Sequence, residues 1–169
     1  MIKIPDPSMS VNSPELMAYR LFNTRIVDEY VTPFWLATNI KSIAVNCPGG
    51  RLATLVINCH GFVNEKQEFV GLDIGTGLYK TDIGPNFDRL KGLIDVIHIP
   101  ACKAAAGSSG RAFCAELARI THATVFAADS NQSVGWTDAA AVASGGCIDN
   151  YEGQVYKFGN SSPPEAVSF

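Results

Sequence analysis

The sequence predicts an α/β domain, a three-layer sandwich in which a mostly parallel sheet carries helices on both faces. Short apolar runs rich in β-branched residues, which are typical of buried parallel strands, lie at residues 52–58, 96–99 and 124–128. Segments with a helical pattern separate these runs. The alternation of strands with helices favours parallel pairing through helical crossovers, and it defines the fold class.

The N-terminal part of the chain predicts two helices and one strand. Residues 1–12 are expected to form an extended arm. A Ser-Pro pair, which favours a helix start, precedes a predicted helix at residues 16–22. Residues 25–31 predict a first strand despite their charges. The Thr-Pro pair at 32–33 begins a second helix, which ends before the Cys-Pro-Gly-Gly sequence at 47–50.

The later elements follow from turn residues and periodicity. Glycines divide residues 62–83 into short alternating pieces, which predicts a β-hairpin or a similar excursion. Residues 85–93 predict a short helix, and a Gly-Ser-Ser-Gly sequence leads into an amphipathic helix over residues 107–121. The last predicted strand lies at residues 154–158. No internal repeat or long linker divides the chain, so residues 1–169 are expected to form a single domain.

Composition argues against several classes of protein. Hydrophobic residues make up 47% and charged residues 17% of the 169 residues, the balance of a globular protein. The net charge is -3 and no basic block is present, which argues against nucleic-acid binding. No run approaches the roughly 18 apolar residues of a membrane span, and the N-terminus lacks the apolar core of a signal peptide. We therefore expect a cytoplasmic protein, or one delivered into a target cell without a signal peptide.

The five cysteines are widely spaced and include no Cys-x-x-Cys pair. This arrangement predicts neither a disulfide framework nor a zinc site, and we expect no metal or cofactor. Cys59, Cys114 and Cys147 are expected to pack in the core or in loops. Cys102 differs, because it follows a buried strand at the point where the chain turns, and α/β sheets bind their ligands at that edge.

His60 and Cys102 each follow a predicted buried strand. If the two strands are parallel neighbours, roughly 4.8 Å apart, the imidazole and the thiol face each other at one edge of the sheet. Such a pair suits nucleophilic catalysis, in which the thiolate attacks a carbonyl carbon and the histidine acts first as base and then as acid. Gly61 leaves room for a substrate backbone, and its N–H and that of Cys102 are candidate oxyanion donors.

Two motifs resemble those of a known family. An apolar strand followed by His-Gly at 60–61, and a second followed by Pro-Ala-Cys-Lys-Ala at 100–104, resemble the caspase-like cysteine peptidases. In that family the catalytic His and Cys end adjacent parallel strands in this chain order, about 50 residues apart in caspases. Here they lie 42 residues apart. The Ala-Gly-x-x-Gly and Leu-Ala-x-x-Thr sequences that follow, at 106–110 and 117–121, are closest to bacterial members, including the CHAT-type proteases.

The resemblance implies a cysteine endopeptidase with Cys102 as nucleophile, His60 as general base and acid, and Gly61 as oxyanion donor. It is compatible with a bacterial toxin or effector domain. The partners of such a domain would be a peptide or protein substrate and a cognate inhibitor or immunity protein. The alternative is a catalytically inactive caspase-like module that binds a peptide or a partner chain, since a fold does not by itself determine function.

Three further residues are candidates for substrate binding. Asp129, after the third buried strand, either orients His60, selects a basic substrate side chain or caps a loop. Asp73 lies in the excursion that follows His60 and is a comparable candidate. Trp136 either lines a specificity pocket or anchors a surface loop. His98 lies inside a strand and is expected to pack in the core or face an edge.

Overall fold

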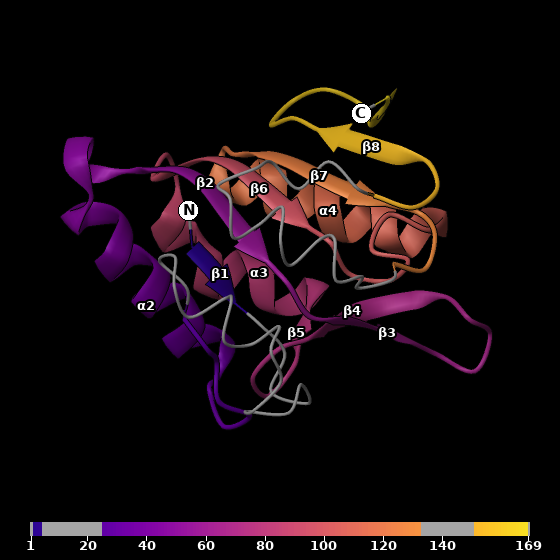
Figure 1. Ribbon diagram of the computed structural model, residues 1–169, viewed down its shortest axis with the longest axis horizontal. Helices are drawn as coiled ribbons and strands as arrows, with labels where there is room; N and C mark the ends of the chain where they lie inside the picture. The colour runs from indigo at the N-terminus through magenta and orange to yellow at the C-terminus, as the bar shows by residue number, and fades with distance from the viewer. Residues whose placement is uncertain (1, 5–24, 133–150, 169) are drawn as a thin grey trace.

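A six-stranded sheet forms the centre of the molecule, in the order β1-β2-β6-β7-β8-β9 (Figure 1). The computed structural model describes residues 2–4, 25–132 and 151–168. Strands β1 (Ile2–Ile4), β2 (Leu52–Ile57), β6 (Ile94–Ile99) and β7 (Thr124–Ala128) pair in parallel. Strands β8 (Val155–Phe158) and β9 (Glu165–Val167) continue the sheet in antiparallel fashion. The mixed α/β class and the parallel centre of the sheet are therefore confirmed.

The three α-helices in the described part of the chain pack on one face of this sheet. They are α2 (Pro33–Asn46), α3 (Lys80–Phe87) and α4 (Gly107–Thr121), and α3 and α4 lie behind the sheet in Figure 1. The expectation of helices on both faces is wrong for these residues. Each parallel connection moves one strand further in the same direction across the sheet, so right-handed crossovers place the described helices on the same side. The helix predicted at residues 16–22 lies outside the described residues.

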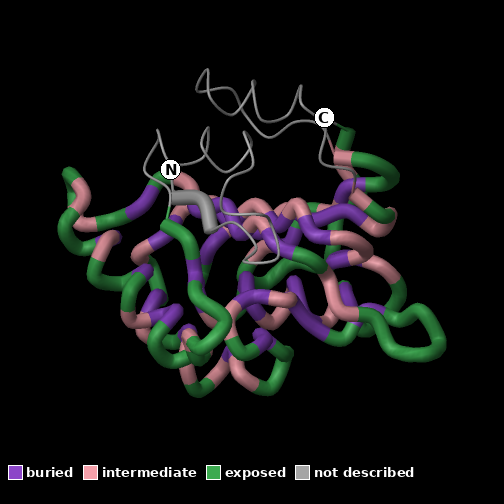
Figure 2. The backbone as a smooth tube through the Cα atoms, turned by 60° about the horizontal axis from the view of Figure 1, so that its bottom comes forward, coloured by how far each residue is buried: buried purple, intermediate pink, exposed green. Residues whose placement is uncertain are grey.

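Alternate residues of the central strands build the core beneath these helices. Leu55 and Ile57 on β2, Ile97 and Ile99 on β6, and Val125 on β7 are all completely buried. Each such side chain contributes roughly 1.5–3 kcal/mol on burial. Three buried phenylalanines fill the space between the sheet and the helices: Phe69, Phe87 and Phe113. Figure 2 shows the buried segments running through the middle of the molecule, with exposed segments at its loops.

The strand predicted at residues 25–31 does not form. The Asp28 carboxylate accepts a hydrogen bond from the Tyr30 N–H at 3.0 Å, and the Asp28 carbonyl accepts one from the Val31 N–H at 3.0 Å. These bonds close a turn, which competes with an extended conformation. The predicted second helix is confirmed as α2, and the Thr32 hydroxyl caps it by accepting from the Trp35 N–H.

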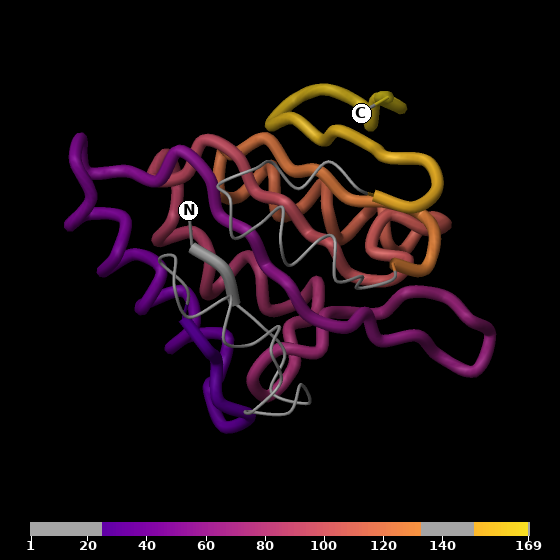
Figure 3. Tube along the Cα trace, viewed as in Figure 1, coloured from indigo at the N-terminus to yellow at the C-terminus, as the bar shows by residue number. Residues whose placement is uncertain are grey.

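The excursion predicted after residue 61 is a small antiparallel sheet of β3 (His60–Val63), β4 (Phe69–Asp73) and β5 (Leu78–Tyr79). The β3–β4 hairpin projects beyond the main sheet (Figure 3). The helix expected at residues 85–93 begins earlier, because the Asp82 carboxylate accepts the Tyr79 N–H at 2.9 Å and caps the chain there. It ends at Phe87, and a 3₁₀ turn at Asp88–Leu90 follows it.

Sequence patterns missed the two outer strands of the main sheet. Residues 2–4 of the expected extended arm pair with β2 as strand β1, and β9 follows a Pro-Pro pair near the C-terminus. Each has three residues, too few for an alternating pattern to be recognised. The strand predicted at residues 154–158 is confirmed as β8. No helix in the described part of the chain is both long and apolar enough to cross a membrane.

The face of the sheet opposite the helices carries a stacked aromatic cluster. His98 on β6 lies between the rings of Phe126 and Tyr151, at centroid distances of 5.2 and 6.2 Å. The Tyr151 hydroxyl donates to the Phe126 carbonyl at 3.1 Å, so the His98 Nδ1, 3.3 Å from the hydroxyl oxygen, is assigned as the donor to it. His98 therefore packs against the sheet, as expected, and anchors the segment that leads into β8.

We expect the free energy of unfolding to fall as the pH decreases below about 6.5, the usual pKa of histidine. Burial lowers the pKa of His98 in the folded protein, so the unfolded chain binds the proton first on acidification. The stability that neutral His98 provides is complete above the unfolded pKa and is lost as the pH falls towards the folded one. Thermal unfolding of the wild type and of His98→Phe across this range measures the effect. Parallel pH dependences for the two proteins would contradict it.

Candidate active site

The two strands that precede His60 and Cys102 are parallel neighbours in the sheet. Residues 54–56 of β2 pair in register with residues 96–98 of β6. His60 lies three residues beyond the end of β2, and Cys102 three residues beyond the end of β6. The two therefore reach the same carboxyl edge at the same height, as the sequence predicted. His60 is also the first residue of β3, so the same residue begins the projecting hairpin.

Gly61 packs directly on the backbone of Cys102. A Cβ atom at position 61 would lie 2.1 Å from the Cys102 carbonyl oxygen and 3.3 Å from the Phe69 ring. Ordinary contacts of a Cβ begin near 3.4 Å, so only glycine fits here. This close approach brings the His-Gly motif and the cysteine loop together.

Several backbone contacts hold the loop that carries Cys102. The Lys103 N–H donates to the Ser130 carbonyl and the Ala105 N–H to the Ala128 carbonyl, both at 2.9 Å. On the opposite side, the Cys114 thiol of α4 donates to the Ala104 carbonyl at 3.3 Å. The loop is thus tied both to the end of β7 and to α4, which fixes the position of its cysteine.

A backbone amide also contacts the Cys102 sulfur. The Gln132 N–H donates to Sγ at 3.3 Å, and Sγ lies 3.6 Å from the Gln132 carbonyl, to which the thiol donates. The Gln132 side chain holds this segment by bonding both the carbonyl and the N–H of Glu152, at 2.8 and 3.0 Å. An N–H aimed at sulfur stabilises a thiolate. The sequence did not point to Gln132, because the group that contacts sulfur is a backbone N–H, which nearly every residue type has.

The structure separates the three candidates for substrate binding. Asp73, the last residue of β4, lies directly opposite His60 in the antiparallel pair. Asp129 Oδ1 accepts from the Gln154 N–H at 3.0 Å and from the Ser130 hydroxyl at 3.2 Å, so this side chain caps a loop. Trp136 lies outside the described residues. Asp73 is therefore the candidate that the fold brings to the histidine.

Two other described cysteines, Cys59 and Cys114, are buried, whereas Cys102 and Cys47 are half-buried. Cys59 is 6% exposed and belongs to the core, and Cys114 is completely buried. Burial raises the pKa of the Cys114 thiol well above its usual range, which makes it a poor nucleophile. Both match the expected packing roles, and Cys147 lies outside the described residues. Across residues 2–4, 25–132 and 151–168, no group of three or more His, Cys, Asp or Glu side chains is arranged to hold a metal ion.

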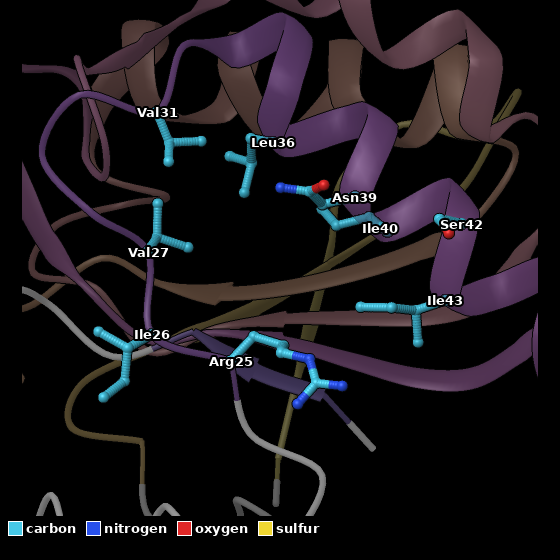
Figure 4. Close-up of a pocket in the computed structure, with 9 residues that line it drawn as sticks. All are labelled: Arg25, Ile26, Val27, Val31, Leu36, Asn39, Ile40, Ser42 and Ile43. Atoms are coloured by element: carbon cyan, nitrogen blue, oxygen red, sulfur yellow. The ribbon is translucent and has the colours of Figure 1, made fainter.

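A cavity of about 330 Å³ lies elsewhere, between α2 and the segment before it (Figure 4). Its lining is mostly apolar and includes none of the candidate site residues. The residues that line it are Arg25, Ile26, Val27, Val31, Leu36, Asn39, Ile40, Ser42 and Ile43. The candidate active site, at the carboxyl edge of β2 and β6, is therefore separate from this cavity.

Comparison with known proteins identified no relative of this chain. No protein-family model matches the chain, and a search of curated proteins found no significant match. The functional argument therefore depends on the residues and contacts at the carboxyl edge of β2 and β6.

Proposed function

We propose that the chain is a caspase-like cysteine peptidase with Cys102 as nucleophile and His60 as general base and acid. The observation that carries the proposal is the packing of Gly61 on the Cys102 carbonyl, at the shared edge of two parallel strands. This contact makes the two sequence motifs parts of one site. A peptide or protein is the substrate class that the resemblance of these motifs to the caspase-like peptidases implies. A bacterial toxin or effector, restrained by a cognate inhibitor or immunity protein, is the setting that the motifs favour.

The proposed chemistry proceeds in two stages. His60 takes the proton from the Cys102 thiol, and the thiolate attacks the carbonyl carbon of the scissile peptide bond. The N–H groups of Gly61 and Cys102 bind the oxyanion, and His60 then protonates the departing amine. In the second stage water, deprotonated by His60, attacks the thioester and releases the acid, which restores the thiol.

A non-catalytic caspase-like module that binds a peptide or a partner chain is the second candidate. The observation in its favour is the donation of the Cys102 thiol to the Gln132 carbonyl, which stabilises the neutral form of the sulfur. The same segment offers an N–H to sulfur, so its contacts alone suit either state. The reactivity of the thiol distinguishes the two candidates.

We expect a peptide acyloxymethyl ketone to label Cys102 much faster than the other four cysteines. The electrophile requires a thiolate and a nearby acid, which the proposed site provides. Mass spectrometry after limited labelling of the folded protein gives the rate at each cysteine. Labelling of Cys102 at the rate of Cys47, which is also half-buried, would support the binding module instead.

A further inference from the structure

We propose that Asp73 is a positioning residue for His60, so that the site works as a triad of Cys102, His60 and Asp73. The inference rests on the proposed function and adds a residue that acts through the histidine. It begins from the register of the β3–β4 hairpin, in which His60 and Asp73 are Cα partners at its base.

Residues directly opposite in an antiparallel pair project from the same face, with Cβ atoms about 4.5–5.5 Å apart. A carboxylate at that distance reaches an imidazole ring. The neighbouring pair, Gly61 and Leu72, faces the other way, and Leu72 is completely buried in the core. The His60–Asp73 pair thus shares one face at the base of the hairpin, while Gly61, which has no side chain, contacts the Cys102 carbonyl with its backbone.

The next pair along this face of the hairpin carries an aromatic stack. Phe62 lies opposite Gly71, and the Tyr79 ring covers Gly71, within 2.9 Å of the place where its Cβ would be. The rings of Phe62 and Tyr79 stack at 6.2 Å with an interplanar angle of 8°. Asp73 itself is half-buried. A carboxylate beside an aromatic stack interacts more strongly with an imidazolium than one in open water.

The other charged groups near the site have different partners. Asp129 is bound within its loop by Gln154 and Ser130. Lys103, in the Cys102 loop, donates to Gln67 Oε1 at 3.2 Å. Glu65, Lys66 and Glu68 lie at the tip of the hairpin, and Glu68 accepts from Asn64 there at 2.9 Å. Of these groups, Asp73 is the one in register with His60.

The proposed role of Asp73 leaves the proton balance unchanged. The Cys102 proton moves to one ring nitrogen of His60, while the Asp73 carboxylate accepts a hydrogen bond from the N–H at the other. The carboxylate selects the tautomer and stabilises the imidazolium without taking up a proton itself.

The test is the rate of Cys102 alkylation by iodoacetamide as a function of pH in the full chain. In Asp73→Asn the neutral amide stabilises the imidazolium less, so the rate at neutral pH falls on the order of tenfold and the rise in rate moves to higher pH. Asp73→Glu keeps the charge and recovers part of the rate. The matched control is Glu68→Gln, which removes the same charge from the same hairpin and leaves the profile unchanged. Thermal melting verifies that each variant is folded.

The outcomes separate this inference from the proposed function. Alkylation that depends on His60 but is the same in Asp73→Asn as in the wild type would show that Asp73 is not a positioning residue. An equal shift of the pH profile in Glu68→Gln would show the same. In both cases the proposed pair of Cys102 and His60 would be retained. If alkylation is independent of His60 in the wild type, the proposed function and this inference are both overturned. A shifted profile in Asp73→Asn, restored in part by Asp73→Glu, supports the triad.

Discussion

Replacing Cys102 with alanine is expected to abolish peptide hydrolysis and electrophile labelling at the site while leaving the fold nearly intact. The thiol is the proposed nucleophile, and the other described cysteines lie too deep or too far away to replace it. Its side chain is half-buried just beyond the end of a strand, and within the described residues its hydrogen bonds are to the backbone of Gln132, which is itself half-buried. Fluorogenic peptide libraries measure the first effect and thermal unfolding the second.

Cys59→Ala is the control for this experiment. Cys59 lies next to the proposed catalytic histidine in sequence but is buried in the core. Its removal is expected to cost about 1–2 kcal/mol of stability and to leave hydrolysis per folded molecule unchanged. If both variants lost activity equally and neither changed its melting temperature, the assignment of Cys102 as nucleophile would be wrong.

Gly61→Ala is expected to disable the site and to destabilise the protein by about 1–3 kcal/mol. The new methyl group would lie 2.1 Å from the Cys102 carbonyl oxygen, so the two backbones must separate. The Cys102 loop cannot move away easily, because contacts with Ala128, Ser130 and Cys114 hold it from behind. Chemical denaturation and the rate of Cys102 labelling measure the two effects.

Gly84→Ala provides the matched control. Gly84 lies inside α3, has no atom within 4 Å of its would-be Cβ, and has no positive φ. Alanine is the better helix former by about 1 kcal/mol, so this variant should be as stable as the wild type or slightly more stable, with normal labelling. If Gly61→Ala behaved in the same way, the contact between Gly61 and the Cys102 carbonyl would not be needed to hold the site together.

The sequence was most informative where local patterns were long. The strands ending at residues 57, 99 and 128 and the amphipathic helix α4 match their predicted positions closely, since each repeats one periodicity over several residues. The strand expected at residues 25–31 failed because a single Asp28 side chain closes a turn there. The one-sided helical layer depends on the direction of successive crossovers, which composition does not encode.

In the candidate site, too, some features could be predicted from residue type and others could not. Both strand-end motifs could be located from residue type, and the pairing of their strands confirmed the expected juxtaposition of the two segments. The contact of the Gln132 amide with sulfur could not be predicted, because any residue type can supply a backbone donor. The pairing of Asp73 with His60 could not be predicted either, because the register of a hairpin follows from the length of its turn. Asp129 and Asp73 were equal candidates in sequence, and the hydrogen bonds of Asp129 within its loop now distinguish them.

The rate of Cys102 alkylation against pH, measured for the wild type and for His60→Ala, tests the central claim most directly because it requires no known substrate. In the proposed site an imidazolium beside the sulfur stabilises the thiolate, so the wild type is expected to react rapidly well below about pH 8.5, where an ordinary cysteine ionises. In His60→Ala the rate at the same pH should fall to that of an exposed thiol. Coincident profiles for the two proteins would contradict the peptidase and leave only the α/β fold with its parallel central strands.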